Sequence, residues 1–208
     1  MPARKKRSKK KKTVPKKTGT IRSKLTESIV EDLNRVSRLE LLAQEAALKK
    51  MLKIYSPNKK KTLFSYLQII LQKSPDKRMR HNAAKFLLQN PTKKTVEILK
   101  NSALKDGSHF VRETSIISLA EIPNSGYIET AKQMLFRDRN PSVKQQCAHL
   151  ISKSKKIPKK EKLKILNKAL EILNKKQLTL KIPREIDQNK LAIDYIEKDT
   201  IPYINNNH

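Results

Sequence analysis

Lysine and arginine side chains, gathered into dense runs, are the residues of this chain with the clearest capacity for chemistry. The chain has 48 Lys and Arg against 19 Asp and Glu, a formal net charge of +29 over 208 residues. A positive excess of this size repels itself in a compact fold unless a polyanion neutralises it, and the phosphate backbone of a nucleic acid is such a polyanion. Binding of that kind depends on counterion release, so it weakens steeply with salt and carries little sequence preference.

The densest run is at the N-terminus, where residues 1–24 hold 12 bases and no acid. A block of like charges with Pro2, Pro15 and Gly19 predicts a disordered, solvated arm over residues 1–22. The arm bases expected to follow phosphates are Arg4, Lys5, Lys6, Arg7, Lys9, Lys10, Lys11, Lys12, Lys16 and Lys17. Three other interpretations stay open: a nuclear-import signal, a contact with an anionic membrane surface, and a tail that only increases solubility.

Two further basic zones flank a near-neutral middle. Residues 56–105 and 141–182 each carry 12 bases against 2 acids, whereas residues 106–140 carry 4 against 5. Bases near helix starts and turns gather along an edge of a helical stack, which predicts ridges that contact phosphate. The candidates are Lys59, Lys60, Lys61, Lys77, Arg78, Lys93, Lys94, Lys155, Lys156, Lys159 and Lys160. The alternative is an ordinary solvated helix surface.

Aromatic residues are too few and too scattered to form a platform for stacking bases. The chain has no Trp. Its four Phe, at positions 64, 86, 110 and 136, occupy apolar helix positions and are expected in the core. We therefore expect binding to the backbone of duplex or structured nucleic acid, with DNA and RNA both open, and not to base sequence.

Catalytic chemistry has little support in the sequence. The four His, at positions 81, 109, 149 and 208, form no metal-ligand spacing, and three Gly cannot build a phosphate-cradling loop. The single Cys147 excludes an intrachain disulfide and a cysteine-based zinc site, and it is expected to be a buried, inert thiol. The expectation is a chain that is not an enzyme and has no cofactor or metal.

The element that must position these lysines is a repeat. Residues 79–87, 111–119 and 143–151 match one another at a constant offset of 32 residues. Each segment begins with an apolar residue followed by a base, as in Met79 and Arg80. Two small or apolar residues follow, such as Ala83 and Ala84, and a large apolar residue such as Leu87 stands three positions after them. A unit this short cannot bury its own apolar face, so neighbouring units must stack. The period predicts an all-α, right-handed α-solenoid of helical hairpins, with three repeats at residues 73–105, 106–137 and 138–174.

Apolar patterns predict the secondary structure of the segments before and after the repeats. One apolar stripe predicts a single long helix from about Ser23 to Ile54 or Tyr55, and a second helix follows at about 58–72. Together, residues 23–72 would form a capping hairpin. The C-terminal residues 175–208 are expected to hold an extended segment near 177–183, a short helix at about 187–198 and a frayed Asn-rich end.

The repeats resemble the HEAT family, in its short PBS-lyase-like form. The resemblance rests on Asp106 followed by Arg112 and on Asp138 followed by Lys144, the Asp and base that form a hydrogen-bonded ladder along a HEAT stack. The first repeat departs from the pattern because Ser74 stands in place of the Asp, although Arg80 is kept. The resemblance implies a scaffold that binds proteins or nucleic acids, and a structural role for the four ladder residues.

The sequence thus favours a non-enzymatic scaffold that binds nucleic acid or a ribonucleoprotein. The alternative is a protein–protein scaffold whose basic arm is a targeting signal or contacts an acidic partner, and the near-neutral residues 106–140 favour it. No apolar run is long enough to span a bilayer, and no secretory signal is present. The expected location is intracellular: the nucleus in a eukaryote, otherwise the cytoplasm or nucleoid.

Overall fold

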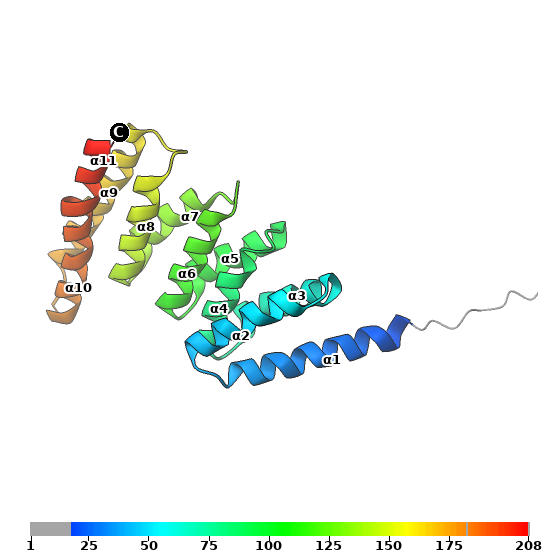
Figure 1. Ribbon diagram of the computed structural model, residues 1–208. Coiled ribbons are helices and arrows are strands. Elements are labelled where there is room, and N and C mark those ends of the chain that lie inside the picture. The colour runs from blue at the N-terminus through cyan, green and yellow to red at the C-terminus, as the bar shows by residue number, and fades with distance from the viewer. Residues whose placement is uncertain (1–17, 182, 208) are drawn as a thin grey trace, which may run out of the picture.

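The computed structural model describes residues 18–181 and 183–207, and within that part of the chain every regular element is a helix (Figure 1). The helices are α1 Thr18–Ser37, α2 Leu41–Ile54, α3 Pro57–Lys73, α4 Lys77–Leu87, α5 Lys93–Lys105, α6 His109–Glu121, α7 Tyr127–Arg137, α8 Pro141–Lys153, α9 Lys159–Gln177, α10 Pro183–Asp194, the π-helical turn η1 Tyr195–Thr200, and α11 Ile201–Asn207. Consecutive helices stack along one axis, which confirms the predicted all-α solenoid.

The helices form two layers. Helices α2, α4, α6, α8 and α10 pack side by side in one layer, and α1, α3, α5, α7 and α9 pack in the other. Because consecutive helices run in opposite directions, the turns alternate between two edges of the stack (Figure 1). One edge, called here the lysine edge, holds the turns at 55–56, 88–92, 122–126 and 154–158. The other, called the ladder edge, holds the turns at 38–40, 74–76, 106–108, 138–140 and 178–181.

Local sequence explains where several helices begin. Ser56 caps α3 by accepting a hydrogen bond from the Lys59 backbone N–H, and Pro57 occupies the first helical position. Asn140 and Pro141 begin α8 in the same way. These signals fix the turns, and the turns fix which residues reach each edge.

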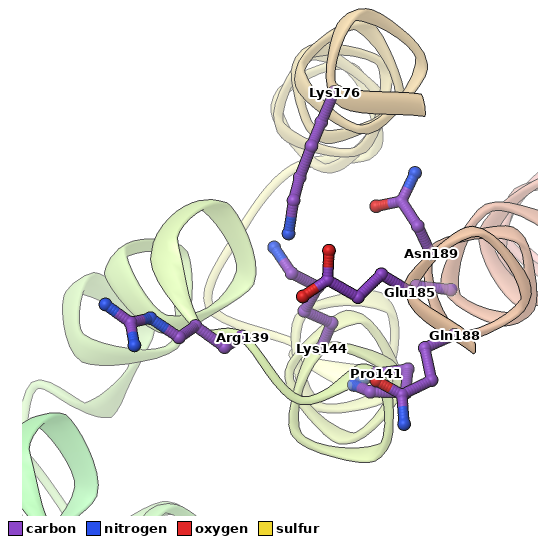
Figure 2. Close-up of a pocket in the computed structure, with 8 residues that line it drawn as sticks. Arg139, Pro141, Lys144, Lys176, Glu185, Gln188 and Asn189 are labelled. Carbon is purple, nitrogen blue, oxygen red and sulfur yellow. The ribbon is translucent and has the colours of Figure 1, made fainter. Parts of the chain in front are cut away.

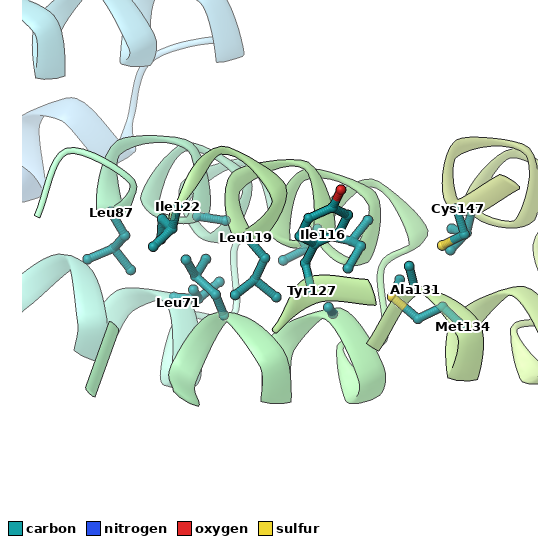
Figure 3. Packing of buried hydrophobic residues seen from close by; sticks show 14 of the residues in the cluster. Leu71, Leu87, Ile116, Leu119, Ile122, Tyr127, Ala131, Met134 and Cys147 are labelled. Carbon is teal, nitrogen blue, oxygen red and sulfur yellow. The ribbon is translucent and has the colours of Figure 1, made fainter. Parts of the chain in front are cut away.

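The core follows the 32-residue period. Ala83, Ser115 and Cys147 occupy the same position in successive repeats, and all three are fully buried. Four residues further on, Leu87, Leu119 and Ile151 are fully buried as well. Figure 3 shows this continuous apolar packing between the layers. Each repeat therefore buries its apolar face against the next, as the period predicts.

The predicted long helix is wrong, because the chain breaks at residues 38–40 into α1 and α2. The buried Gln44 side chain donates to the Leu39 carbonyl at 3.0 Å and accepts a hydrogen bond from Asn82 at 3.1 Å. The break folds α2 back, so that α1 packs on α3 while α2 packs on α4. The break lets this segment cover apolar surface on both α3 and α4, where a continuous helix would cover only one of them. This additional packing favours the break over a continuous helix.

The predictions for both ends also need correction. Residues 18–22, expected in the disordered arm, begin α1, and the arm residues 1–17 lie outside the described part of the chain. At the C-terminus, Gln177 still belongs to α9 and Pro183 already begins α10, so the extended segment expected near 177–183 is wrong at both ends. The helix expected at about 187–198 is present within a longer helical segment over 183–207. Buried Ala192, Ile196 and Ile204 pack this last segment on α8 and α9, so it caps the stack.

The four phenylalanines differ in how deeply they are buried. Phe86 is buried, and Phe64 and Phe136 are partly buried against the core. Phe110 is 55% exposed, which contradicts the expectation of a core residue. It lies at the second position of α6, where the adjacent His109 ring is 4.3 Å from its own, centroid to centroid.

Candidate nucleic-acid interface

The lysine edge brings together most of the predicted ridge. Helices α3, α5 and α9 all begin there, and the first turn of each carries lysines. Lys61, Lys93, Lys94, Lys155, Lys156 and Lys160 are exposed, and Lys60 is half-buried. Within the described residues, none of these seven ammonium groups has a carboxylate within 4.0 Å. Their charge is therefore available to a ligand.

Two of the predicted lysines on this edge are held by the protein itself. The Lys59 ammonium lies 4.1 Å from the centre of the Tyr55 ring, 3.2 Å from the Ser28 hydroxyl and 3.8 Å from an Asp32 carboxylate oxygen. Lys159 donates to the Asn205 carbonyl at 3.3 Å, which ties α9 to the end of α11. Lys59 therefore joins α1 to α3 and Lys159 joins two C-terminal helices, so both ammonium groups already have partners within the protein.

Lys77 and Arg78 do not belong to the predicted ridge, because α4 begins at the ladder edge. Helix α3 is 17 residues long, so its two ends are about 25 Å apart. Arg78 pairs with Asp76 at 3.3 Å and with Glu40 at 3.1 Å, while Lys77 is exposed. The expectation that helix starts gather on one edge is wrong for α4, because α3 and α4 are antiparallel.

The lysine edge contains two clusters with a gap between them. Lys60, Lys61, Lys93 and Lys94 form the first, at the starts of α3 and α5. Lys153, Lys155, Lys156 and Lys160 form the second, around the α8–α9 turn. The intervening α6–α7 turn carries no base and ends α6 with the exposed Glu121. Three helix starts in one layer at about 10 Å spacing place the clusters about 20 Å apart.

The helix starts themselves favour anions. The first turns of α3 and α5 contain no acidic residue. Free backbone N–H groups give a helix N-terminus a positive potential, so a lysine there opposes folding by a few tenths of a kcal/mol while a phosphate is stabilised. Lysines at two adjacent helix starts therefore slightly lower the stability of the fold, and a bound phosphate would offset this repulsion.

The ladder residues form ion pairs between successive repeats. Arg80 donates to both carboxylate oxygens of Asp106, at 2.8 and 2.9 Å, and Arg112 donates to both of Asp138, at 2.7 and 2.8 Å. Each base thus pairs with the Asp of the next repeat, 26 positions on, and Arg112 meets only the backbone carbonyl of Asp106. The last base, Lys144, donates to the Leu135 carbonyl at 2.8 Å.

A pocket at the end of the ladder was not identified from the sequence. Its lining includes Lys144, Lys176, Glu185 and Asn189 (Figure 2). Asp106 and Asp138 are the C-cap residues of α5 and α7, whereas the longer α9 has Leu178 at its C-cap. The 32-residue period reaches only Leu170, inside α9, so it did not locate the rung that lacks a carboxylate.

Cysteine and histidine side chains of the described residues are buried or partly buried. Cys147 is fully buried, as predicted, and burial raises the pKa of its thiol. The His81 ring is hydrogen-bonded to the Thr114 hydroxyl at 2.8 Å, and burial lowers its pKa. In this part of the chain no three His, Cys, Asp or Glu side chains lie together as metal ligands would. No described helix is long and apolar enough to cross a bilayer.

Comparison with known proteins identifies the repeats. Residues 64–152, from α3 to the end of α8, match a family model described as HEAT repeats. Searches of curated proteins and of solved structures each found no match. The resemblance inferred from the ladder residues is confirmed for this segment.

Proposed function

Because residues 64–152 are HEAT repeats, which generally form non-enzymatic helical scaffolds, we propose that this protein is a scaffold that binds the phosphate backbone of nucleic acid along its lysine edge. The single observation that carries the proposal is the cluster Lys60, Lys61, Lys93 and Lys94. These four ammonium groups lie without carboxylate partners, among the described residues, at two adjacent helix starts.

The charge arrangement on the two edges supports this choice. On the ladder edge, Arg78, Arg80 and Arg112 are each paired with carboxylates. Bases without carboxylate partners, among the described residues, lie on both edges, but only on the lysine edge do four of them meet at two adjacent helix starts. Counterions held by this cluster would be released on phosphate binding, and their release drives association.

The N-terminal arm starts on the same side of the molecule. Helix α1 begins at Thr18 beyond the lysine edge (Figure 1). The 17 preceding residues span at most roughly 55–60 Å when extended. The bases from Arg4 to Lys17 lie outside the described residues, and we propose them as a tethered second contact, which would raise the overall affinity without new specificity.

The test compares two variants of the full chain with equal net charge. The lysine-edge variant carries Lys60→Gln, Lys61→Gln, Lys93→Gln and Lys94→Gln. The ladder-edge variant carries Lys73→Gln, Lys105→Gln, Arg137→Gln and Lys181→Gln, all at exposed positions. Each variant loses four positive charges, so a difference between them reports where nucleic acid binds.

We expect the lysine-edge variant to bind duplex DNA or structured RNA at least tenfold more weakly than the wild type, as measured by fluorescence anisotropy. The ladder-edge variant should remain within about threefold of the wild type, since only the general field changes. Equal losses in the two variants would refute a located phosphate site.

A second candidate function, protein binding, is favoured by one observation. Phe110 and Ile117 are 55% and 36% exposed on α6, in the near-neutral middle of the stack. They lie seven residues apart, so they share one helix face and present an apolar patch to a partner. Its test is the double variant Phe110→Ser and Ile117→Ser, which should abolish capture of a protein partner and leave nucleic-acid binding unchanged.

A further inference from the structure

The pocket at the C-terminal end of the ladder edge lies between three helices. The start of α8 supplies Arg139, Pro141 and Lys144, the end of α9 supplies Lys176, and α10 supplies the acidic and amide side chains Glu185, Gln188 and Asn189. Figure 2 shows Lys144 and Lys176 directing their ammonium groups into this space, while the Arg139 guanidinium turns away from it. The site lies on the edge opposite to the proposed nucleic-acid contacts and does not depend on them.

The pocket occupies the place where the ladder lacks a carboxylate. Arg112 and Arg80, one and two repeats earlier, each bind an aspartate with two hydrogen bonds. Lys144 holds the same repeat position, but no carboxylate of the described residues lies within 4.0 Å of its ammonium. Only 5% of Lys144 is exposed, and of its three N–H groups one donates to the Leu135 carbonyl.

The electrostatics of the pocket are unbalanced. Burial and the nearby Lys176 ammonium lower the pKa of Lys144 to about 8. Glu185 lines the pocket, yet its carboxylate is more than 4.0 Å from every cation in the described part of the chain. Two ammonium groups therefore face one unpaired carboxylate, and Arg139 adds a third positive charge to the lining, so the pocket has a positive excess that a bound carboxylate reduces. Asn189 is unavailable as a donor, because its amide binds the Leu173 carbonyl and the Gln177 side chain.

We propose that this pocket binds a carboxylate group, which completes the third rung of the ladder against Lys144 and Lys176. The ligand is a small carboxylic acid or the carboxylate of a peptide chain. In either case the carboxylate accepts charge-assisted hydrogen bonds from the two ammonium groups, as Asp106 and Asp138 do from the arginines above them.

The experiment is a titration of the full chain with sodium acetate against sodium chloride at constant ionic strength, followed by NMR shifts of residues 139–192. Lys176→Met removes one ammonium from an exposed position and spares the core. Lys175→Met is the matched control, because the adjacent Lys175 ammonium pairs with Glu171 at 2.6 Å and does not line the pocket. Glu185→Gln removes the competing carboxylate, and a short peptide with a free C-terminus replaces acetate in a second series.

We expect saturable shifts with acetate in the wild type and in Lys175→Met, about tenfold weaker binding in Lys176→Met, and tighter binding in Glu185→Gln. Tighter binding of the peptide than of acetate assigns the ligand to a chain terminus, and the reverse assigns it to a small acid. Equal weakening by Lys175→Met and Lys176→Met would overturn the proposal, as would shifts that never saturate. Preference for inorganic phosphate over acetate would overturn the assignment to carboxylate.

Discussion

At the residue scale, the ladder ion pairs are the polar contacts with the largest expected effect on stability. The Arg112 and Asp138 side chains are only 14% and 6% exposed, and they meet in a two-bond geometry. Replacing Arg112 with Met leaves a nearly buried carboxylate without its cation. We expect the free energy of unfolding to fall by about 3 kcal/mol, as measured by urea denaturation.

The control for that prediction is Lys175→Gln. Lys175 and Glu171 form an exposed pair on one helix, so this change should cost less than about 1 kcal/mol. Similar losses in the two variants would show that the ladder pairs are no stronger than ordinary surface pairs.

Lys144 predicts an unusual dependence of stability on pH. Its pKa is lowered to about 8 in the folded chain, against about 10.4 when exposed. Between these values the unfolded chain binds more protons, so Lys144 adds stability as the pH rises from 8 towards 10. The free energy of unfolding of the wild type minus that of Lys144→Met should therefore rise over this window. A flat difference would show that Lys144 is not desolvated.

Cys147 provides a direct probe of the core. Its thiol is fully buried, and burial raises its pKa. We expect thiol reagents to label it only at the rate at which the protein opens, so labelling should accelerate with urea in step with unfolding. Fast labelling of the native protein would contradict the packing of α8 against its neighbours.

At the element scale, Gln44 holds the break between α1 and α2. Its amide donates to the Leu39 carbonyl, and its oxygen accepts from the buried Asn82. Gln44→Met keeps the length of the side chain but removes the donor to the Leu39 carbonyl and the acceptor of the Asn82 amide. The Asn82 amide then keeps only its longer bond to the Leu41 carbonyl at 3.4 Å. We expect a loss of about 2–4 kcal/mol in the free energy of unfolding, from circular dichroism during denaturation. A loss below about 1 kcal/mol would mean that apolar packing alone sets the break.

The elements also show what sequence reasoning can reach. The repeats were predictable because their 32-residue period, caps and apolar spacing all agree. The α1–α2 break was not, since neither Gly nor Pro marks residues 38–40 and the apolar stripe continues through them. It depends on Gln44 meeting Asn82 from a helix 38 positions away. At the C-terminus only a short helix at about 187–198 was predicted, and the longer helical segment over 183–207 packs against α8 and α9.

At the scale of the whole molecule, the sequence identified the basic zones but not the edge of the helical stack on which each base lies. Lys60, Lys61, Lys93 and Lys94 meet on one edge because α3 and α5 are parallel members of one layer. Lys77 and Arg78 are close to them in sequence, yet they lie across the stack because α4 runs the other way. Counting charges along the sequence locates the basic zones, but the direction in which each helix runs decides on which edge its lysines lie.

The salt dependence of nucleic-acid binding shows directly whether phosphate is bound at the lysine edge. For duplex DNA, the slope of log K against log salt changes by about 0.9 for each phosphate contact. The slope for the lysine-edge variant should be shallower than that of the wild type by about 3–4, whereas the ladder-edge variant should differ by less than about 1. Equal slopes in the two variants, or a wild-type slope near zero, would contradict a phosphate-binding surface on the lysine edge.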